Sequence, residues 1–258
     1  MPVQLSEGQP VKYQLQLGEN AADINDEVGK HIHIRFTGDM YCVRCGRKVR
    51  KLFGEGFCYP CFRDAPEAAE CIVRPELCQG HLGIGRDPEW EESHHNQPHA
   101  VYLAVTSAIK VGVTRVTQIP TRWIDQGAAM AVQVAQTPYR QLAGEIEVSL
   151  KQLYTDRTQW QRMLKNEIVD GVDFDHELRK IRDELPPILS QYLLDATSMR
   201  PMTITYPVQS HPVKIKSVNL QKTPEAEGTL MGVRGQYLIL NEGRVLNVRR
   251  DRKSTRLN

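Results

Sequence analysis

Apolar and polar side chains alternate along two stretches near the start of the chain. VKYQLQL (11–17) and HIHIRF (31–36) follow this two-residue repeat, and GEN and TGD supply turn residues after them. The alternation returns beyond residue 200 in MTITYPV, VKIKSVNL, GTLMGVRGQYLIL and RVLNVRR. The pattern predicts that residues 1–40 and 200–250 are β segments that pack together as a barrel or a sandwich.

Residues 100–199 combine strand and helix patterns. VYLAV, IKVGVT and AVQVAQ are predicted strands, and IPTRWIDQGA between the last two opens a helix at Pro120 and Thr121. Farther along, a three- and four-residue repeat predicts a second helix with one buried stripe, formed by Leu142, Ile146, Leu150 and Leu153. The predicted order is β-β-α-β-α, followed by further helices that break at Pro186 and Pro187.

Composition limits the class of protein. The chain has 258 residues, of which 40% are hydrophobic, so it can bury a substantial core. Its net charge of +2 excludes a dedicated polycation and restricts nucleic-acid binding to local patches. No apolar run approaches the length of a membrane span, and MPVQLSEGQP does not have the pattern of a signal peptide. We therefore expect a cytoplasmic protein with reduced cysteines and no membrane partner.

Residues 41–99 show little periodicity and are rich in Cys, His, Gly and Pro, which is typical of a segment held by metal. Cys42 and Cys45 form one CxxC pair, and Cys58 and Cys61 form another. Four thiolates complete the tetrahedral shell of a structural Zn²⁺ ion, with bonds of about 2.3 Å. A redox dithiol and an iron site are the alternatives.

A second group of metal-ligand types follows the CxxC pairs. The candidate ligands of a second, mixed zinc site are Cys71, Cys78, His81 and His95, with His94 and His99 nearby. Their spacing is irregular, so a buried thiol among scattered surface histidines is the alternative.

Basic residues follow Cys42, within and after the first CxxC pair. They are Arg44, Arg47, Lys48, Arg50 and Lys51. A local patch of this kind indicates contacts with the phosphates of DNA or RNA. The alternative is a solvated loop whose charges have no ligand.

The central segment resembles the GIY-YIG nuclease superfamily. AVYLA around Tyr102 is similar to the GIY strand of that superfamily, KVG (110–112) to the YIG strand, Arg122 to the helix arginine, and Glu147 to the metal-binding glutamate. The resemblance implies phosphodiester hydrolysis with Mg²⁺ or Mn²⁺. In that reaction Glu147 holds the cation, Arg122 neutralises the phosphate and Tyr102 helps to deprotonate water. The chain departs from the pattern at Lys110, because lysine can contact phosphate but cannot supply a phenolate.

The same residues also have a purely structural interpretation. Tyr102 would then be a packing residue of a strand, Arg122 a charge at the start of a helix, and Glu147 a solvated helix residue. Over residues 1–250 the chain in addition resembles an uncharacterised bacterial family with a domain of unknown function. This resemblance rests on segments such as CVRC, CYPC, RPELC, IPTRWIDQGA and GTLMGVRGQYLIL, and it implies no particular activity.

We therefore expect an α+β protein with β segments 1–40 and 200–250, a zinc-binding segment 41–99, and a GIY-YIG-like domain with appended helices at 100–199. The predicted function is that of a zinc-containing nucleic-acid-binding protein that cleaves phosphodiester bonds. The alternative is a non-catalytic, zinc-stabilised adaptor that binds nucleic acid or protein through a degenerate GIY-YIG scaffold. DRKSTRLN (251–258) looks like a translated sequencing adapter, and we exclude it from fold prediction.

Overall fold

The computed structural model describes residues 1–6, 8–17 and 20–248 of the chain. The stretch assigned to a sequencing adapter, residues 251–258, lies outside the described residues. The molecule is mixed α+β, as the sequence predicted, with several sheets and short helices. Among the described residues, no helix is both long enough and apolar enough to cross a membrane.

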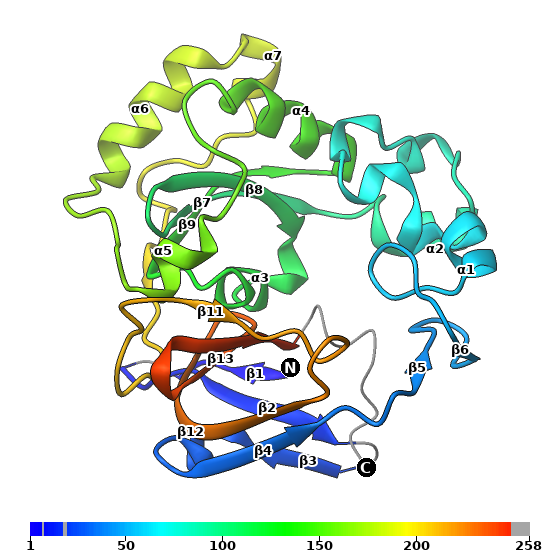
Figure 1. Cartoon of the computed structure of the whole chain (residues 1–258). Helices are drawn as coiled ribbons and strands as arrows, with labels where there is room; N and C mark the ends of the chain where they lie inside the picture. Colours follow the sequence, from blue (N-terminus) through cyan, green and yellow to red (C-terminus); the bar gives the residue numbers. More distant parts are fainter. Residues whose placement is uncertain (7, 18–19, 249–258) are drawn as a thin grey trace.

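An antiparallel sheet with strand order β10-β9-β7-β8 occupies the centre of the molecule (Figure 1). Its strands are β7 (His99–Val105), β8 (Ile109–Arg115), β9 (Met130–Thr137) and β10 (Met202–Thr203). Every residue of β7 is buried, because the sheet is covered on both faces. Val101 and Leu103 belong to the core on one face, whereas Tyr102 and Ala104 belong to the core on the other, as the two-residue repeat of a strand requires.

Helices cover the first of these faces. They are α4 (Arg140–Leu150), α6 (Phe174–Glu184) and α7 (Pro187–Ser190), with α6 and α7 separated at Pro186 as predicted. Ala143, Ile146 and Leu150 of α4 are fully buried against the sheet. Leu153, which was predicted to belong to the same stripe, lies beyond the end of α4 and is exposed. The chain turns after Leu150, and Tyr154 is buried instead.

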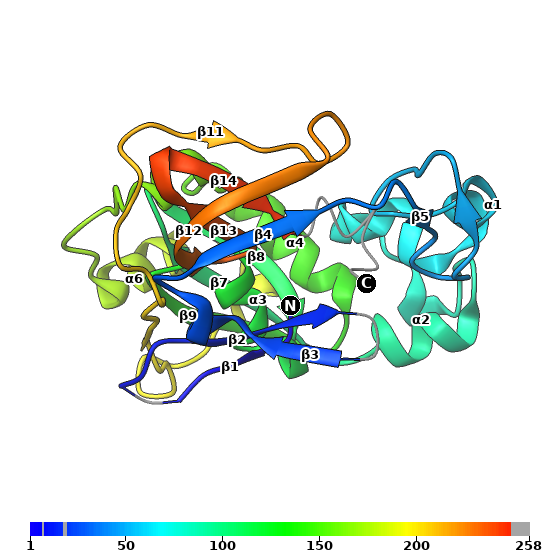
Figure 2. The same ribbon diagram turned by 60° about the horizontal axis from the view of Figure 1, so that its bottom comes forward.

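A β-rich unit covers the other face of the central sheet and combines both ends of the chain. Its five-stranded sheet has the order β11-β14-β13-β12-β4. These strands are β4 (His31–Arg35), β11 (Lys216–Ser217), β12 (Glu225–Arg234), β13 (Tyr237–Leu240) and β14 (Arg244–Asn247). A three-stranded sheet lies beside it, formed by β1 (Val3–Gln4), β2 (Lys12–Leu17) and β3 (Asn20–Asp23). Figure 2 shows β4 alongside β12, where Ile34 pairs with Ala226.

Two short helices, α3 (Thr121–Asp125) and α5 (Trp160–Leu164), lie between the central sheet and the β-rich unit (Figure 1). Arg234 of β12 crosses this boundary. It is 2% exposed, and its guanidinium donates hydrogen bonds to the carbonyl oxygen of Gly127 (3.2 and 3.1 Å) and to Oδ1 of Asn166 (2.7 Å). A buried guanidinium needs such acceptors, so these bonds fix the two parts of the fold against each other.

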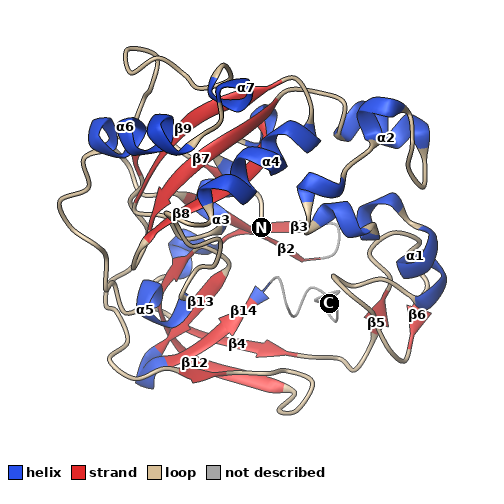
Figure 3. Cartoon of the chain, turned by 90° about the horizontal axis from the view of Figure 1, so that it is seen from above, coloured by secondary structure: helices blue, strands red, loops and turns tan. Residues whose placement is uncertain are grey.

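Residues 41–99, which we call the cysteine-rich segment, flank the central sheet on the side away from α6 (Figure 3). Its regular elements are β5 (Met40–Tyr41), β6 (Lys48–Val49), α1 (Tyr59–Asp64), α2 (Pro88–His94) and the 3-10 turns Pro66–Ala68, Glu70–Ile72, Pro75–Leu77 and Gly80–Leu82. Around the CxxC pairs, the buried core consists only of Cys42, Phe57, Cys58 and Ala65 among the described residues. So small a core needs additional support.

Candidate functional site

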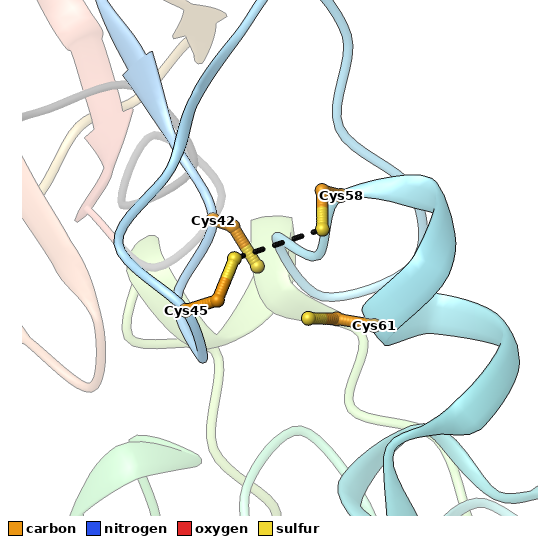
Figure 4. Close-up of side chains that lie close together, drawn as sticks. All are labelled: Cys42, Cys45, Cys58 and Cys61. Carbon is orange, nitrogen blue, oxygen red and sulfur yellow. Dashed lines mark hydrogen bonds between the residues drawn. The ribbon is translucent and has the colours of Figure 1, made fainter.

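The four cysteines of the CxxC pairs converge in the cysteine-rich segment. Cys42 and Cys45 come from the loop between β5 and β6, where Gly46 has a φ of 67°, and Cys58 and Cys61 come from the start of α1. Figure 4 shows the four side chains pointing toward one another, and their sulfur atoms all lie within 4.8 Å of one another. We call this group the four-cysteine cluster.

The geometry of the four-cysteine cluster suits Zn²⁺. The sulfurs of Cys45 and Cys58 are 3.8 Å apart. Ligands of a tetrahedral ion with bonds of about 2.3 Å lie roughly 3.8 Å from each other, whereas bonded sulfurs lie about 2.05 Å apart. All of these cysteines are free thiols. The four-cysteine cluster can therefore bind zinc.

The thiols of this cluster influence one another's pKa. Burial opposes ionisation of Cys42, but hydrogen bonds from the backbone near Cys45, Cys58 and Arg44 outweigh it and lower the pKa of Cys42 to about 6. The pKa of Cys61 is raised to about 12, mainly by its hydrogen bond with the Cys58 side chain. Thiols this close cannot all ionise unless a cation neutralises them, which favours a bound metal ion.

A second group comprises Cys71, Cys78, Glu91 and His95, whose ligand atoms also lie within 4.8 Å of one another. We call it the mixed site. Nδ1 of His95 is 3.4 Å from Sγ of Cys78 and 4.0 Å from Sγ of Cys71, and it also contacts Oε2 of Glu91. A tetrahedral Zn²⁺ ion would place sulfur and nitrogen ligands roughly 3.6 Å apart.

The geometry of the mixed site distinguishes between two interpretations of these residues, a metal site and a catalytic relay. A Cys-His-Glu relay uses both ring nitrogens of the histidine, one for the thiol and one for the carboxylate. Here the thiols and the carboxylate all approach Nδ1. Glu91 and His95 are 2% and 3% exposed, so their polar groups need a partner inside the protein. Two thiols and one carboxylate gathered around one ring nitrogen are the arrangement that a shared ion would require.

The two thiols of the mixed site have pKa values that are shifted in opposite directions. The pKa of Cys78 is lowered to about 4, mainly by the hydrogen bond from the Cys71 thiol, with His95 acting in the same direction against burial. The same pairing raises the pKa of Cys71. One thiolate is therefore already available to a cation.

The structure places Glu91, rather than His81, with the other three predicted ligands. The ring of His81 stacks on Tyr139, with centroids 4.2 Å apart, and His94 stacks on Trp90 in the same way at 4.1 Å. The sequence pattern of cysteines and histidines does not single out Glu91, because carboxylates are less typical zinc ligands than thiolates and imidazoles. The signal was its four-residue spacing from His95, which puts both side chains on one face of α2.

The residues that resemble the nuclease motifs come from four elements and lie near one another. They are Tyr102 on β7, Lys110 on β8, Arg122 on α3 and Glu147 on α4, and we call them the central cluster. Tyr102 pairs with Gly112 across the sheet. A Cβ atom on Gly112 would lie 2.7 Å from Cζ of Tyr102, so glycine leaves the room that the ring needs.

Charges in the central cluster act on one another. The pKa of Lys110 is lowered to about 8, mainly by burial; Arg122 acts in the same direction, while Glu147 and Asp156 oppose the shift. Burial raises the pKa of Glu147, and the nearby lysines, Lys110 among them, oppose this. Burial also raises the pKa of Tyr102, whose hydroxyl accepts a hydrogen bond from Gln126. Lys110 therefore lies close to both the Arg122 cation and the Glu147 carboxylate in a largely buried setting.

The five predicted nucleic-acid contacts are all exposed but differ in their partners. Arg44 pairs with Glu67 and Lys48 with Asp39, each at 2.6 Å. The ammonium of Lys51 lies 5.0 Å from the ring centroid of Phe53. Within the described ranges, no carboxylate comes within 4.0 Å of Arg47 or Arg50. Arg47, Arg50 and Lys51, which we call the basic trio, therefore keep charge available for an anion.

These features define a mixed α+β protein with a cysteine cluster that can bind zinc. The chain belongs to the family described as protein of unknown function (DUF2797), whose model matches residues 29–253. The match includes both groups of metal-ligand residues and the central cluster. No curated protein and no solved structure matches the chain.

Proposed function

We propose that the protein binds nucleic acid at the central cluster and hydrolyses a phosphodiester bond with a divalent cation held by Glu147. The main support is that Arg122 and Glu147, from separate elements, both lie close enough to Lys110 and to Tyr102 to shift the pKa of each of these two residues. Cations for a phosphate beside a carboxylate for a metal ion are the groups this reaction requires. The order of β7, β8, α3, β9 and α4 is also the one expected of a GIY-YIG-like domain.

Each side chain has a definite role in this proposal. Glu147 holds Mg²⁺ or Mn²⁺, which when bound stabilises the negative charge of the leaving oxygen. Arg122 binds the phosphate through its planar guanidinium. Lys110 has a pKa of about 8 and is therefore mostly protonated at neutral pH, so its ammonium adds a second phosphate contact. Tyr102 orients the attacking water, because its raised pKa makes it a poor source of phenolate.

The two groups of metal-ligand residues support this function structurally. A closed shell of four protein ligands leaves no position on zinc for a substrate, so we assign the four-cysteine cluster and the mixed site structural roles. They hold a segment with little core in place, and that segment presents the basic trio to solvent. The trio then adds phosphate contacts that do not depend on sequence.

A cleavage assay tests the hydrolytic part of the proposal. The full chain is incubated with single-stranded, double-stranded and branched DNA and RNA, with Mg²⁺ or Mn²⁺, and compared with the variant Glu147→Gln. Glu145→Gln is the matched control, because it makes the same change in the same helix at a residue outside the central cluster. We expect cleavage by the wild type and the control, and a loss of at least about a hundredfold in Glu147→Gln. Equal cleavage by all three proteins would overturn the assignment of Glu147.

A non-catalytic adaptor is the second candidate function, and two observations favour it. Lysine stands in the second tyrosine position, and Tyr102 is only 1% exposed with its hydroxyl already hydrogen-bonded to Gln126. An adaptor would bind nucleic acid with an affinity that falls as salt rises, yet would leave it intact. Salt-dependent binding without cleavage under any tested metal would therefore select this function over hydrolysis.

A further inference from the structure

Helix α4 begins directly against the mixed site. The backbone N–H of Arg140, its first residue, donates a hydrogen bond to the carbonyl oxygen of His95 (2.9 Å). The guanidinium of Arg140 donates to the carbonyl oxygen of Cys71 from Nε (3.1 Å) and Nη2 (3.0 Å), and to that of Ile72 from Nη2 (3.0 Å). The carbonyl oxygens of two residues of the mixed site, Cys71 and His95, therefore accept hydrogen bonds from the same residue of α4.

The chain between Cys71 and Cys78 contacts the same helix one turn farther on. A Cβ atom on Gly144 would lie 2.5 Å from the carbonyl carbon of Pro75 and 2.8 Å from Cα of Glu76, so the backbones touch. The ring of His81 stacks on Tyr139, the residue before α4. Segments that are held by the ligands of the mixed site thus contact α4 at its start and along its first turns.

The face of α4 that meets the mixed site also carries Glu147. At about 100° per residue, Arg140, Gly144 and Glu147 fall within roughly 60° of one another around the helix axis. The core residues Ala143, Ile146 and Leu150 occupy a different face. The hydrophobic core therefore holds one side of α4, while the cysteine-rich segment contacts the side that carries Glu147.

We propose that zinc binding at the mixed site positions helix α4, and that Arg140 is the positioning residue that connects them. An ion bound by Cys71, Cys78, Glu91 and His95 fixes the carbonyl oxygens of Cys71 and His95, and these set where the helix begins. Occupancy of the mixed site by zinc then determines the orientation of Glu147, which lies farther along the same helix. This coupling is a property of the fold and does not rest on the proposed nucleic-acid function.

Hydrogen exchange of the α4 amides, measured by mass spectrometry together with zinc content, tests the coupling on the full chain. Cys78→Ser removes a ligand of the mixed site, and Cys45→Ser is the matched control in the four-cysteine cluster. We expect each variant to lose one zinc ion. Exchange over residues 140–150 should rise about tenfold in Cys78→Ser, which is the effect of one or two lost net hydrogen bonds, and stay unchanged in Cys45→Ser. Unchanged exchange in Cys78→Ser, or an equal rise in both variants, would overturn the proposal.

A second variant keeps the test informative if Cys78→Ser does not fold. Arg140→Gln leaves all four ligands of the mixed site in place but removes the guanidinium. After chelation, zinc alone is added back to the wild type and to Arg140→Gln. We expect both to regain the same zinc content, with exchange over residues 140–150 slowed again only in the wild type. Zinc-dependent slowing of equal size in Arg140→Gln would show that α4 is not positioned through this residue.

Discussion

Gly144 of α4 lies directly against the backbone of Pro75, at a distance that leaves no space for a side chain. Helix propensity alone would favour alanine at this position, by about 1 kcal/mol. The contact reverses this preference, because a Cβ atom would lie 2.5 Å from the carbonyl carbon of Pro75. The packing of α4 against the segment between Cys71 and Cys78 therefore determines the residue at 144.

We expect Gly144→Ala to destabilise the protein by about 1–3 kcal/mol, as overpacking of a close contact does. Val148→Ala is the control on the same helix, since Val148 is 43% exposed and its truncation should cost less than about 0.5 kcal/mol. Urea unfolding of the two variants and the wild type, followed by circular dichroism, measures both effects. A Gly144→Ala protein as stable as the wild type would mean that the turn Pro75–Leu77 moves freely relative to α4.

The buried charge of Lys110 should lower the stability of the protein, although the proposed function requires that charge. The residue is 7% exposed, and burial is the main cause that lowers its pKa from 10.5 to about 8. At neutral pH the lysine is charged in both the folded and the unfolded chain, so the full cost of burying the charge is present. We expect Lys110→Met to raise the free energy of unfolding by roughly 2 kcal/mol at neutral pH, and to weaken nucleic-acid binding.

The pH dependence of this gain has a definite sign. Between about pH 8 and pH 10.5 the folded wild type releases the Lys110 proton before the unfolded chain does. The unfolded state then binds more protons, so the stability of the wild type rises with pH relative to Lys110→Met and the difference closes. Lys151→Met serves as the control, since Lys151 is more exposed and forms a surface ion pair with Asp156. The free energy of unfolding of the wild type and of Lys110→Met is measured by chemical unfolding across this pH range. A difference between them that stayed constant would contradict the prediction.

Much of the fold follows from local pattern. The short, mainly apolar runs VYLAV and IKVGVT predicted β7 and β8, and Pro120 and Thr121 indicated the start of α3. The stripe in α4 was right for Ile146 and Leu150 but not for Leu153. Periodicity cannot show where a helix ends unless a glycine or proline marks the end, and neither follows Leu150.

The local pattern does not contain the information needed to predict which distant segments pair. Alternation predicted strands at 31–36 and in GTLMGVRGQYLIL, but only the structure shows that Ile34 lies opposite Ala226. At the mixed site, the sequence supplied Cys71, Cys78 and His95, whereas the place of Glu91 depends on how α2 lies against the segment that carries the two cysteines. Arg140 could not be inferred either, because its partners are backbone carbonyls some seventy residues earlier, as its sequence separation of 69 from Cys71 shows.

The basic trio makes a prediction about salt dependence that rests on the proposed nucleic-acid function. Each phosphate contact that is lost should reduce the slope of log affinity against log salt by about 1. We expect Arg47→Ala with Arg50→Ala to reduce this slope by about 2. Arg44→Ala should change it little, because Arg44 already pairs with Glu67 at 2.6 Å. Fluorescence anisotropy with a labelled oligonucleotide at several salt concentrations measures the slopes, and equal slopes for all variants would exclude this surface from binding.

His99 should make the protein sensitive to acid. Its side chain is fully buried at the start of β7, and its ring contacts the carbonyl oxygen of Gln97 at 2.7 Å. Burial is the main cause that lowers the pKa of His99 from 6.5 to about 4. Because the pKa is lowered in the folded state, the imidazole contributes fully to stability above pH 6.5, and this contribution is lost as the pH falls toward 4.

The comparison of wild type with His99→Gln isolates this contribution. Glutamine does not titrate, and acid release of zinc affects both proteins alike. The wild type should therefore lose about 2 kcal/mol more than the variant between neutral pH and about pH 5. Thermal unfolding at a series of pH values measures the difference. Parallel stability curves for the two proteins would mean that His99 is protonated in the folded state as readily as in the unfolded chain, which its complete burial in β7 argues against.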